Sequence, residues 1–440
     1  MSFLKIEGSA PLSGSVEISG SVSCSLRMLY AACYSSDDVV IENVSNVPIF
    51  DLQIRLLQDL GVKVQWLTDT KITVNASGIN KYEVSKDLGE LTRGSLLISG
   101  PLLYRFRKAV IPKLSQTLQI NRPSNRLVET WTKLGIDVKE TDSHYELDST
   151  DIHSAEINFR SPTQSGTDHA IITSTFVKGD TIINSASEEP ETDDLILFVN
   201  SLGGNVQRIE PSVIKVTGVE SFKSGYGRVP SSKNELVMYA TAAILTKGNL
   251  IIQNMQKNYI APFSNLLNNL NVNFDFNQNT MRVWDTENQL VPQRIEFSNF
   301  PKLIQDWYGP ICLILTNCNG ESLVHNPSQP QAPEFIRDLT RMGADVEVLR
   351  PSDVGFSSHV IHDAYDIKKQ GEPLSVLKIV GPKKLRGERI DVSDYFYPEV
   401  MVLAALGAEG RSEISGYEKA EKRFKNFYTN LARLGAKITV

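Results

Sequence analysis

The sequence contains few of the residues that build disulfide frameworks or metal centres. Its 440 residues include 4 cysteines and 6 histidines. The histidines do not cluster with Cys, Asp or Glu at ligand spacing, so we expect no metal site and no cofactor. The thiols are expected to be buried and reduced, as in a cytosolic protein. Their spacing matches neither a zinc site nor a Cys-x-x-Cys redox pair, the four being Cys24, Cys33, Cys312 and Cys318.

Long apolar runs and a strong charge of one sign are also lacking. No stretch approaches the length of a membrane span, and the first residues, MSFLKIEGSA, lack the apolar core of a signal peptide. We therefore expect a cytoplasmic protein with no membrane partner. The formal net charge of -6 argues against nucleic acid as the main partner.

What the sequence does contain is a repeat. Six times, an amphipathic helical pattern ends on Leu-Gly or a close variant, and a short apolar strand pattern follows at once. Subtraction of the marker positions gives intervals of 74, 68, 68, 72 and 92 residues. Glycine suits the left-handed position that closes a helix, and a period of this length predicts six copies of one α/β unit. The marker positions are Gly61, Gly135, Gly203, Asn271, Gly343 and Gly435.

Alternating strand and helix patterns within each unit predict an α/β fold whose helices pack against sheets. Six units indicate two similar domains of three units each. Gly, Pro and Ser cluster in GYGRVPSSKNE (225–235), which places one crossing between the domains near residue 230 and a second near residue 20. The predicted domains are 21–229, and 1–20 together with 230–440. The segment from Arg350 to about Gln370 accounts for the longest interval and is predicted to be a surface insertion.

Two three-unit domains with a double crossover resemble the enolpyruvyl transferase family over essentially the whole sequence. Its main members are enolpyruvylshikimate-phosphate synthase and UDP-N-acetylglucosamine enolpyruvyl transferase. The resemblance implies domains of three βαβαββ-type units with pseudo-threefold symmetry, an inside-out α/β barrel. It also implies enolpyruvyl transfer from phosphoenolpyruvate to a hydroxyl of a phosphorylated cyclic hydroxy acid or a nucleotide sugar. The small anionic substrate would lie in the interdomain cleft, and the oligomeric state is left open.

Two segments resemble the part of the family that holds the acceptor. In GSVSCSLRMLYAA (20–32), Ser23 and Arg27 fall where the family holds the phosphate and carboxylate of its acceptor. In PTQSG (162–166), Thr163 and Gln164 fall where the shikimate enzyme has an acceptor-binding Ser and Gln. Arg93, with the EEPE run that follows Ser187, is more similar to the sugar-nucleotide enzyme.

Three further residues resemble those that act on phosphoenolpyruvate or on the acceptor hydroxyl. Arg122 in RPSNRLV matches an arginine that grips phosphoenolpyruvate, and Lys422 lies where a phosphate-gripping Lys or Arg belongs. Asp306 in IQDWYGP matches the aspartate regarded as the base for the hydroxyl. Such chemistry needs cations on the two anionic groups of phosphoenolpyruvate and a carboxylate that takes the hydroxyl proton.

At three positions the sequence departs from this pattern. Val22 stands where the family has a lysine, Ala332 or a neighbour stands where it has an arginine, and Phe396 stands where it has another. A buried charge-assisted contact is worth about 1.5–3 kcal/mol, so the loss of three would weaken binding by several powers of ten.

The residues also allow simpler interpretations. Arg27 can be a solvated helix residue, and Asp306 can be the N-cap of the helix that starts at Trp307. For Lys422, in the charge-rich run EKAEKRFK, a solvated face is favoured.

Three functions remain open at this point. The first is a divergent enolpyruvyl transferase. The second is an enzyme of the same fold that no longer uses phosphoenolpyruvate and performs an elimination or another acid–base step on a shikimate-phosphate-like ligand. The third is a non-catalytic descendant that binds a ligand. The fold alone does not choose among them.

Overall fold

The computed structural model describes residues 2–115, 124–285, 289–362, 365–395 and 397–439. The chain divides into two compact units. The central unit is Gly20–Pro230, and the terminal unit is Met1–Ser19 together with Ser231–Val440. None of the helices in these described ranges has the length and apolar character needed to cross a membrane.

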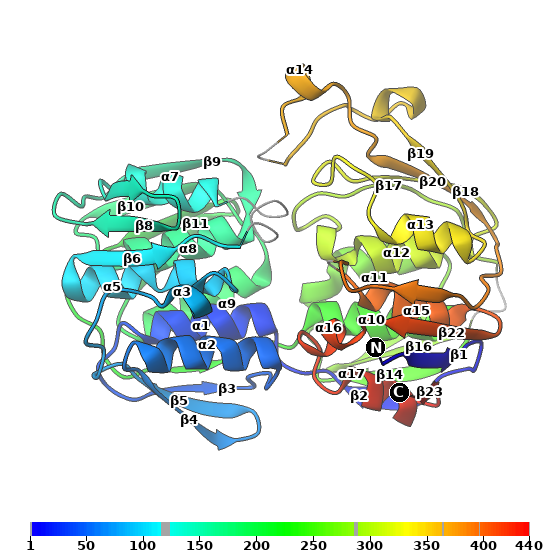
Figure 1. Cartoon of the computed structure of the whole chain (residues 1–440), viewed down its shortest axis with the longest axis horizontal. Coiled ribbons are helices and arrows are strands. Elements are labelled where there is room, and N and C mark those ends of the chain that lie inside the picture. The colour runs from blue at the N-terminus through cyan, green and yellow to red at the C-terminus, as the bar shows by residue number, and fades with distance from the viewer. Residues whose placement is uncertain (1, 116–123, 286–288, 363–364, 396, 440) are drawn as a thin grey trace. The chain divides into compact units, whose positions relative to one another are not determined.

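The central unit alternates strands and helices throughout, as Figure 1 shows. Its elements are α1 (Val22–Ala32), β3 (Val39–Glu42), α2 (Pro48–Asp59), β4 (Lys63–Thr68), β5 (Lys71–Asn75), α3 (Lys86–Gly89), α4 (Gly94–Leu97), α5 (Ser99–Phe106), β6 (Lys108–Pro112), α7 (Asn125–Lys133), β7 (Asp137–Glu140), β8 (His144–Asp148), β9 (Glu156–Thr163), α8 (Gln164–Ser174), β10 (Asp180–Ala186), α9 (Pro190–Ser201), β11 (Asn205–Glu210), β12 (Val213–Thr217) and β13 (Tyr226–Arg228).

The terminal unit has the same alternation, with the first two strands of the chain built into it. Its elements are β1 (Leu4–Glu7), β2 (Ser13–Glu17), α10 (Lys233–Leu245), β14 (Asn249–Gln253), η1 (Lys257–Ile260), α11 (Ala261–Asn269), β15 (Asn273–Asn277), β16 (Thr280–Trp284), β17 (Arg294–Glu296), η2 (Gln305–Trp307), α12 (Tyr308–Leu315), β18 (Gly320–His325), α13 (Phe335–Arg341), β19 (Asp345–Leu349), η3 (Pro351–Val354), α14 (Ile367–Gln370), β20 (Val376–Gly381), β21 (Arg389–Asp391), α15 (Glu399–Gly407), β22 (Arg411–Ser415), α16 (Glu418–Glu421), α17 (Phe427–Arg433) and β23 (Lys437–Thr439).

Five of the sheets formed by the described residues repeat one strand pattern. A parallel pair at one edge is followed by two antiparallel strands, as in β9-β10-β12-β11 and β17-β18-β20-β19. In the sheet β6-β8-β7, a single parallel bridge from Glu83 to Val110 stands in place of the edge strand. Each repeat therefore reads strand, helix, strand, helix, strand, strand.

The helix ends at the six markers follow from one backbone conformation. In each case the C-cap is Leu or Met, and the next residue has a positive φ. Five of these residues are glycines, which adopt this conformation without a Cβ clash, and the sixth is an asparagine, which tolerates it. The φ values are 98° at Gly61, 74° at Gly135, 96° at Gly203, 65° at Asn271, 102° at Gly343 and 104° at Gly435. The predicted pattern of helix end and strand start is confirmed at all six.

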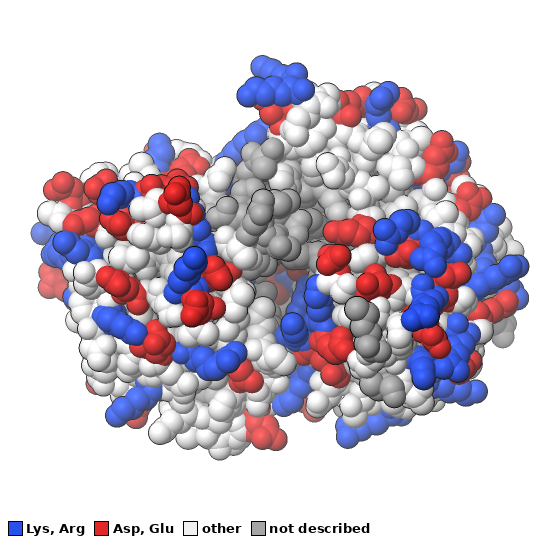
Figure 2. Space-filling view, in the orientation of Figure 1, with Lys and Arg blue, Asp and Glu red and all other residues white. Residues whose placement is uncertain are grey.

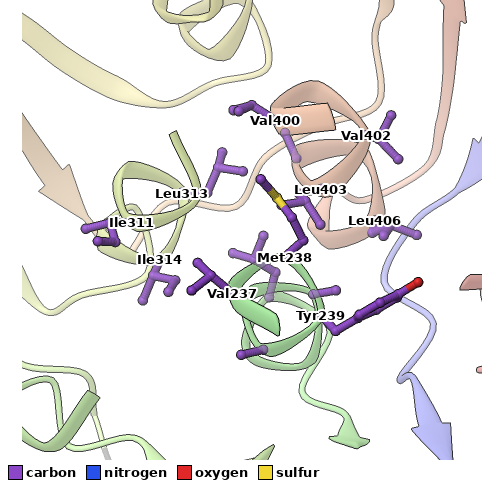
Figure 3. Close-up of a cluster of buried hydrophobic side chains, with 14 of the residues drawn as sticks. Val237, Met238, Tyr239, Ile311, Leu313, Ile314, Val400, Val402, Leu403 and Leu406 are labelled. Atoms are coloured by element: carbon purple, nitrogen blue, oxygen red, sulfur yellow. The ribbon is translucent and has the colours of Figure 1, made fainter. Parts of the chain in front are cut away.

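The inner helices of each unit are buried over most of their surface. In the terminal unit, α10, α12 and α15 pack against one another, and Figure 3 shows Val237, Ile314 and Leu403 from these helices meeting in the core. In the central unit, every residue of α8 from Gly166 to Ser174 is buried. An ionisable side chain in such a helix must therefore find a partner inside the protein.

Three further features complete the fold. The predicted insertion from Arg350 to Gln370 contains η3 and α14, and no residue of α14 is buried, which confirms its surface position. Lys and Arg are interspersed with Asp and Glu on the visible face of each unit in Figure 2, in keeping with the small net charge. The four cysteines are free and buried, as predicted.

Candidate active site

In the central unit, the predicted acceptor residues Arg27 and Gln164 are in contact. Arg27 lies on α1, and its Nη2 donates to Oε1 of Gln164 at the start of α8 over 3.2 Å. The Arg27 side chain is 11 % exposed, so it is not the solvated helix residue of the simpler interpretation. Its Nε forms an ion pair with Oδ2 of Asp168, a fully buried residue of α8 that the sequence analysis did not single out.

The charge of Arg27 is therefore compensated inside the protein. Burial raises the pKa of Asp168 to about 6, while the Arg27 cation and a hydrogen bond from Thr192 oppose the rise. The Thr192 hydroxyl donates to Oδ1 of Asp168 over 3.0 Å. Glu189 and Glu191 add negative charge nearby and push this pKa upward.

The remaining central-unit candidates have separate positions. Ser23, on the first turn of α1, is exposed. Thr163 is the N-cap of α8 and accepts a hydrogen bond from the Gly166 amide over 3.3 Å. Arg93 is half-buried at the start of α4. Its charge adds to burial in lowering the pKa of His169 to about 3, so Arg93 lies close to the α8 region.

One arginine near these residues was missed by the sequence analysis. Arg126 on α7 donates from Nη1 to the Ser161 carbonyl over 3.3 Å and from Nη2 to the Ser161 hydroxyl over 3.0 Å. Ser161 belongs to β9, which leads directly into Thr163. Arg122, the arginine predicted from the same RPSNRLV segment, lies outside the described residues. The contact of Arg126 with β9 has no signal in the sequence.

In the terminal unit, Asp306 is a half-buried carboxylate with both oxygens hydrogen-bonded. Asn234 of α10 donates from Nδ2 to Oδ2 over 2.9 Å, and the Tyr397 hydroxyl donates to Oδ1 over 3.1 Å. The Asn234 amide is fixed in turn, because its Oδ1 accepts from the Trp307 indole over 3.0 Å. Asp306 lies within η2, and Trp307 is the N-cap of α12, so the interpretation of Asp306 as that cap is wrong.

Next to Asp306 stands a second ion pair between a buried carboxylate and an arginine. Oε1 of Glu399, the first residue of α15, lies 3.3 Å from Nη1 of Arg423. The Arg423 guanidinium lies over the ring of Tyr397, 4.9 Å from its centroid. Burial raises the pKa of Glu399, Arg423 opposes the rise, and the negative charge of Asp306 adds to it. Lys422, the predicted cation, is exposed at the end of α16.

The departures from the family pattern can be located at two of their three positions. Val22 is the half-buried first residue of α1. Ala332 lines a pocket of about 600 Å³ in the terminal unit. Three carboxylates and one arginine also line this pocket, namely Glu334, Asp391, Asp394 and Arg337. Phe396 lies outside the described residues.

These groups define what the site can do chemically. A fixed carboxylate hydrogen-bonded by neutral donors can accept a proton from a hydroxyl. Arginine beside it can hold an anion. Within the part of the chain that the structure describes, no three His, Cys, Asp or Glu side chains are placed to hold a metal ion.

The fold belongs to a known class of transferases. The structure superimposes on the crystal structure of the enolpyruvyl transferase NikO from Streptomyces tendae with a TM-score of 0.85, at 19% identity, over 99% of this chain and 98% of that one. It superimposes on EPSP synthase from Acinetobacter baumannii with a TM-score of 0.72, at 14% identity, over 100% of both chains. The predicted α/β fold of the enolpyruvyl transferase type is confirmed.

Sequence comparison agrees with the fold. The chain belongs to the family described as EPSP synthase (3-phosphoshikimate 1-carboxyvinyltransferase), which it matches over residues 6–366. It is also similar to UDP-N-acetylglucosamine 1-carboxyvinyltransferases. The enzyme of Hydrogenovibrio crunogenus is 26% identical over 98% of this chain and 100% of that protein. The enzyme of Helicobacter pylori strain P12 is 24% identical over 100% and 99%.

Proposed function

We propose that this protein transfers the enolpyruvyl group of phosphoenolpyruvate to a hydroxyl of a small anionic acceptor, with Asp306 as the base. The geometry of Asp306 carries the proposal. Its two oxygens accept hydrogen bonds from Asn234 and Tyr397, both neutral donors, so the carboxylate is held in a fixed orientation. Membership of the enolpyruvyl transferase class supports the reaction type.

The reaction would proceed in two stages. Asp306 takes the proton of the acceptor hydroxyl while the hydroxyl oxygen bonds to C2 of phosphoenolpyruvate, and C3 gains a proton. The C2–O bond to phosphate then breaks, C3 gives up a proton, and inorganic phosphate leaves. Removal of the base should slow the first stage, and general-base catalysis typically contributes about 10²- to 10⁴-fold.

A nucleotide-linked sugar is the acceptor that we favour. The relatives that match over nearly the full length of this chain carry the name UDP-N-acetylglucosamine 1-carboxyvinyltransferase. The Arg27 charge, offset by Asp168 and flanked by further acids, also suits a phosphate monoester such as shikimate 3-phosphate less well.

A second candidate rests on the pocket beside Ala332. Its three carboxylates are unfavourable for the phosphate and carboxylate of phosphoenolpyruvate. The alternative is an enzyme of this fold that works on the acceptor alone. Asp306 would then remove a proton from carbon, a neighbouring C–O bond would break, and phosphate would leave as a double bond forms.

Phosphate release separates these possibilities. The purified protein is incubated with UDP-N-acetylglucosamine or shikimate 3-phosphate, each with and without phosphoenolpyruvate. Release that requires phosphoenolpyruvate and an acceptor supports transfer, whereas release from shikimate 3-phosphate alone supports elimination. No release under any condition contradicts both and leaves the ligand-binding descendant.

Two variants test the role of Asp306 in that assay. Asp306→Asn keeps the shape of the side chain but cannot take a proton at neutral pH, so we expect a loss of about 10²- to 10⁴-fold in kcat. Asp275→Asn changes an exposed carboxylate of β15 in the same unit and should leave kcat unchanged. Equal rates for the two variants would contradict the assignment.

A further inference from the structure

The central unit has a cavity of about 700 Å³ that none of the candidate site residues lines. Its walls come from the three strands of the sheet β6-β8-β7 and from residues of the segment 82–86. In this sheet the bridge from Glu83 to Val110 stands in place of the parallel edge strand of the other sheets. The cavity therefore lies at the place where this repeat departs from the common strand pattern.

The sequence Ser-His-Tyr-Glu places three polar side chains beside this cavity. Ser143 ends the turn between β7 and β8, and His144 and Glu146 are the first and third residues of β8. Residues two apart in a strand point to the same face of the sheet. The turn is fixed, because the amide and the hydroxyl of Thr141 both donate to the His144 carbonyl over 2.9 Å. The Lys113 amide donates to the Ser143 carbonyl over 2.9 Å.

These three side chains are joined by hydrogen bonds. Ser143 Oγ lies 2.9 Å from Nδ1 of His144, and Nε2 of the same ring lies 3.1 Å from Oε1 of Glu146. Lys139 donates from Nζ to the other Glu146 oxygen over 2.9 Å. The hydrogen bonds from Lys139 and His144 lower the pKa of Glu146, so its oxygens only accept. Nε2 must therefore carry a proton. In a neutral imidazole Nδ1 then has none, and the Ser143 hydroxyl donates to it.

This direction of hydrogen bonding is the one that activates a hydroxyl as a nucleophile. The imidazole can take the hydroxyl proton, and the carboxylate behind it stabilises the imidazolium that forms. The neighbouring strand supplies an apolar wall. In the register of β6 and β8, Pro112 is opposite His144 and Val110 is opposite Glu146, and both line the cavity. Opposite residues project from the same face, so an apolar group fits beside the Ser143 hydroxyl.

We propose that Ser143 is a nucleophile that accepts acyl groups from esters bound in this cavity, with His144 as its base and Glu146 as the residue that orients the ring. The acyl group is small and apolar. The His144 side chain is 32 % exposed, so water screens the charge that develops on the carbonyl oxygen. The substrate class is therefore activated esters, such as aryl esters, whose alcohol leaves readily. This activity is separate from the proposed function and does not rest on it.

The reaction has two stages with water as the second reactant. Ser143 Oγ bonds to the carbonyl carbon as its proton moves to Nδ1 of His144. The bond from that carbon to the alcohol oxygen then breaks, and the alcohol takes the proton from Nδ1. In the second stage water attacks the acyl group, gives a proton to Nδ1 and releases the carboxylic acid, and Ser143 regains its proton. One ester and one water thus give one acid and one alcohol.

Acylation by p-nitrophenyl acetate tests the proposal on the full-length protein. Absorbance follows the release of p-nitrophenol, and peptide mass spectrometry locates the acetyl group, which we expect on Ser143. Ser143→Ala and His144→Gln should slow release about 10²-fold or more. Glu146→Gln should slow it about 10- to 100-fold, because the charge-assisted hydrogen bond to the imidazolium is lost. Ser143→Cys keeps a nucleophile beside His144 and should still be acylated, which excludes misfolding as the cause of the losses.

A second adjacent pair in the same unit provides the control. Nδ1 of His153 lies 3.2 Å from the carbonyl of Ser154, not from its hydroxyl. His153→Gln and Ser154→Ala should therefore leave the rate unchanged. The proposal is overturned if the wild type is not acylated, if the acetyl group lies on another residue, or if the control variants lose as much rate as Ser143→Ala. No step uses phosphoenolpyruvate, so these results are independent of the phosphate-release assay.

Discussion

Each unit of the molecule contains a buried carboxylate paired with an arginine, but the two pairs differ in how completely they are satisfied. In the central unit, Asp168 has both Arg27 and the Thr192 hydroxyl as partners, and Arg27 is 11 % exposed. In the terminal unit, Glu399 relies on Arg423, which is 31 % exposed.

This difference indicates different roles. Arg27 is shared between Asp168 and Gln164 inside the unit, so an incoming anion would have to compete with a fully buried carboxylate. Arg423 is more exposed to solvent than Arg27. The central pair is therefore the more completely buried of the two, and its loss should cost more stability.

The largest effect should come from breaking the central pair. Arg27→Ala leaves Asp168 buried without its cation and should lower the free energy of unfolding by about 3–5 kcal/mol. Combining it with Asp168→Asn should recover a large part of the loss. Arg55→Ala, on the exposed face of α2, is the control and should change stability by less than about 0.5 kcal/mol. Urea unfolding followed by circular dichroism measures all four proteins, and a cost for Arg27→Ala no larger than that for Arg55→Ala would contradict the comparison.

The next largest effect should be the contribution of Asp168 to the pH dependence of stability. Its pKa is about 6 in the folded protein, against 3.8 for an ordinary aspartate. Between these values the folded state binds a proton that the unfolded chain has released, so this group's contribution to stability is complete below about pH 4 and is lost as the pH rises through 6. The change is on the order of 3 kcal/mol.

A comparison of the wild type with Asp168→Asn separates the contribution of Asp168 from that of other acids. Glu235, whose pKa burial raises to about 7, gives a change of the same sign at higher pH. The free energy of unfolding of Asp168→Asn is subtracted from that of the wild type, each measured by urea unfolding at several pH values. Because Glu235 is present in both proteins, its contribution cancels. A difference that stays constant from pH 4 to 7 would rule out the titration of Asp168.

Breaking the terminal pair should cost less. Arg423→Gln leaves Glu399 without its cation, but Arg423 is 31 % exposed against 11 % for Arg27, so the ion pair that is lost is the more solvent-screened of the two. Burial raises the pKa of Glu399, so protonation reduces the loss at low pH. We expect a loss of about 1–3 kcal/mol, smaller than for Arg27→Ala and smaller still at low pH. Thermal unfolding at two pH values measures this loss. The double variant of Glu399→Gln and Arg423→Gln, which has no buried carboxylate at this position, should recover part of it. A loss that grows as the pH falls would contradict this account.

The smallest effect is expected at Lys422. Because its side chain is exposed, Lys422→Ala should change the free energy of unfolding by less than about 0.5 kcal/mol. Thermal unfolding beside Arg423→Gln gives the most direct contrast between two neighbouring cations. A larger effect for Lys422→Ala than for Arg423→Gln would reverse our assignment of the terminal pair.

The fold could be predicted from sequence because its signal is local and repeated. A Leu-Gly marker reports a helix end, a left-handed residue and a strand start within a few positions, and six copies leave little room for another architecture. The site was less predictable because its contacts are distant in sequence. Arg27 and Asp168 are on different helices of different repeats. Asp168 lies in a helix that is buried from Gly166 to Ser174, and the sequence of that helix gives no signal of its partner.

The sequence also could not distinguish between cationic residues that are close together in the chain. Lys422 and Arg423 are adjacent in a charged run, and Arg122 and Arg126 share one segment. Lys422 and Arg423 lie in the turn after α16, where a shift of one residue exchanges an exposed position for a contact with Glu399. Asp306, placed by its neighbours IQDWYGP, could be identified from the sequence as a candidate, but its hydrogen bonds to Asn234 and Tyr397 could not.

The placement of β1 has a consequence for synthesis of the chain. This first strand lies between β22 and β23, with Lys5 opposite both Glu413 and Thr439. It therefore emerges from the ribosome long before either of its neighbours exists. Residues 20–230 can complete their own sheets while the rest is still being made, whereas the sheet that contains β1 must wait for the last strands. The synthesis of β22 and β23 thus sets the earliest moment at which the sheet that contains β1 is assembled.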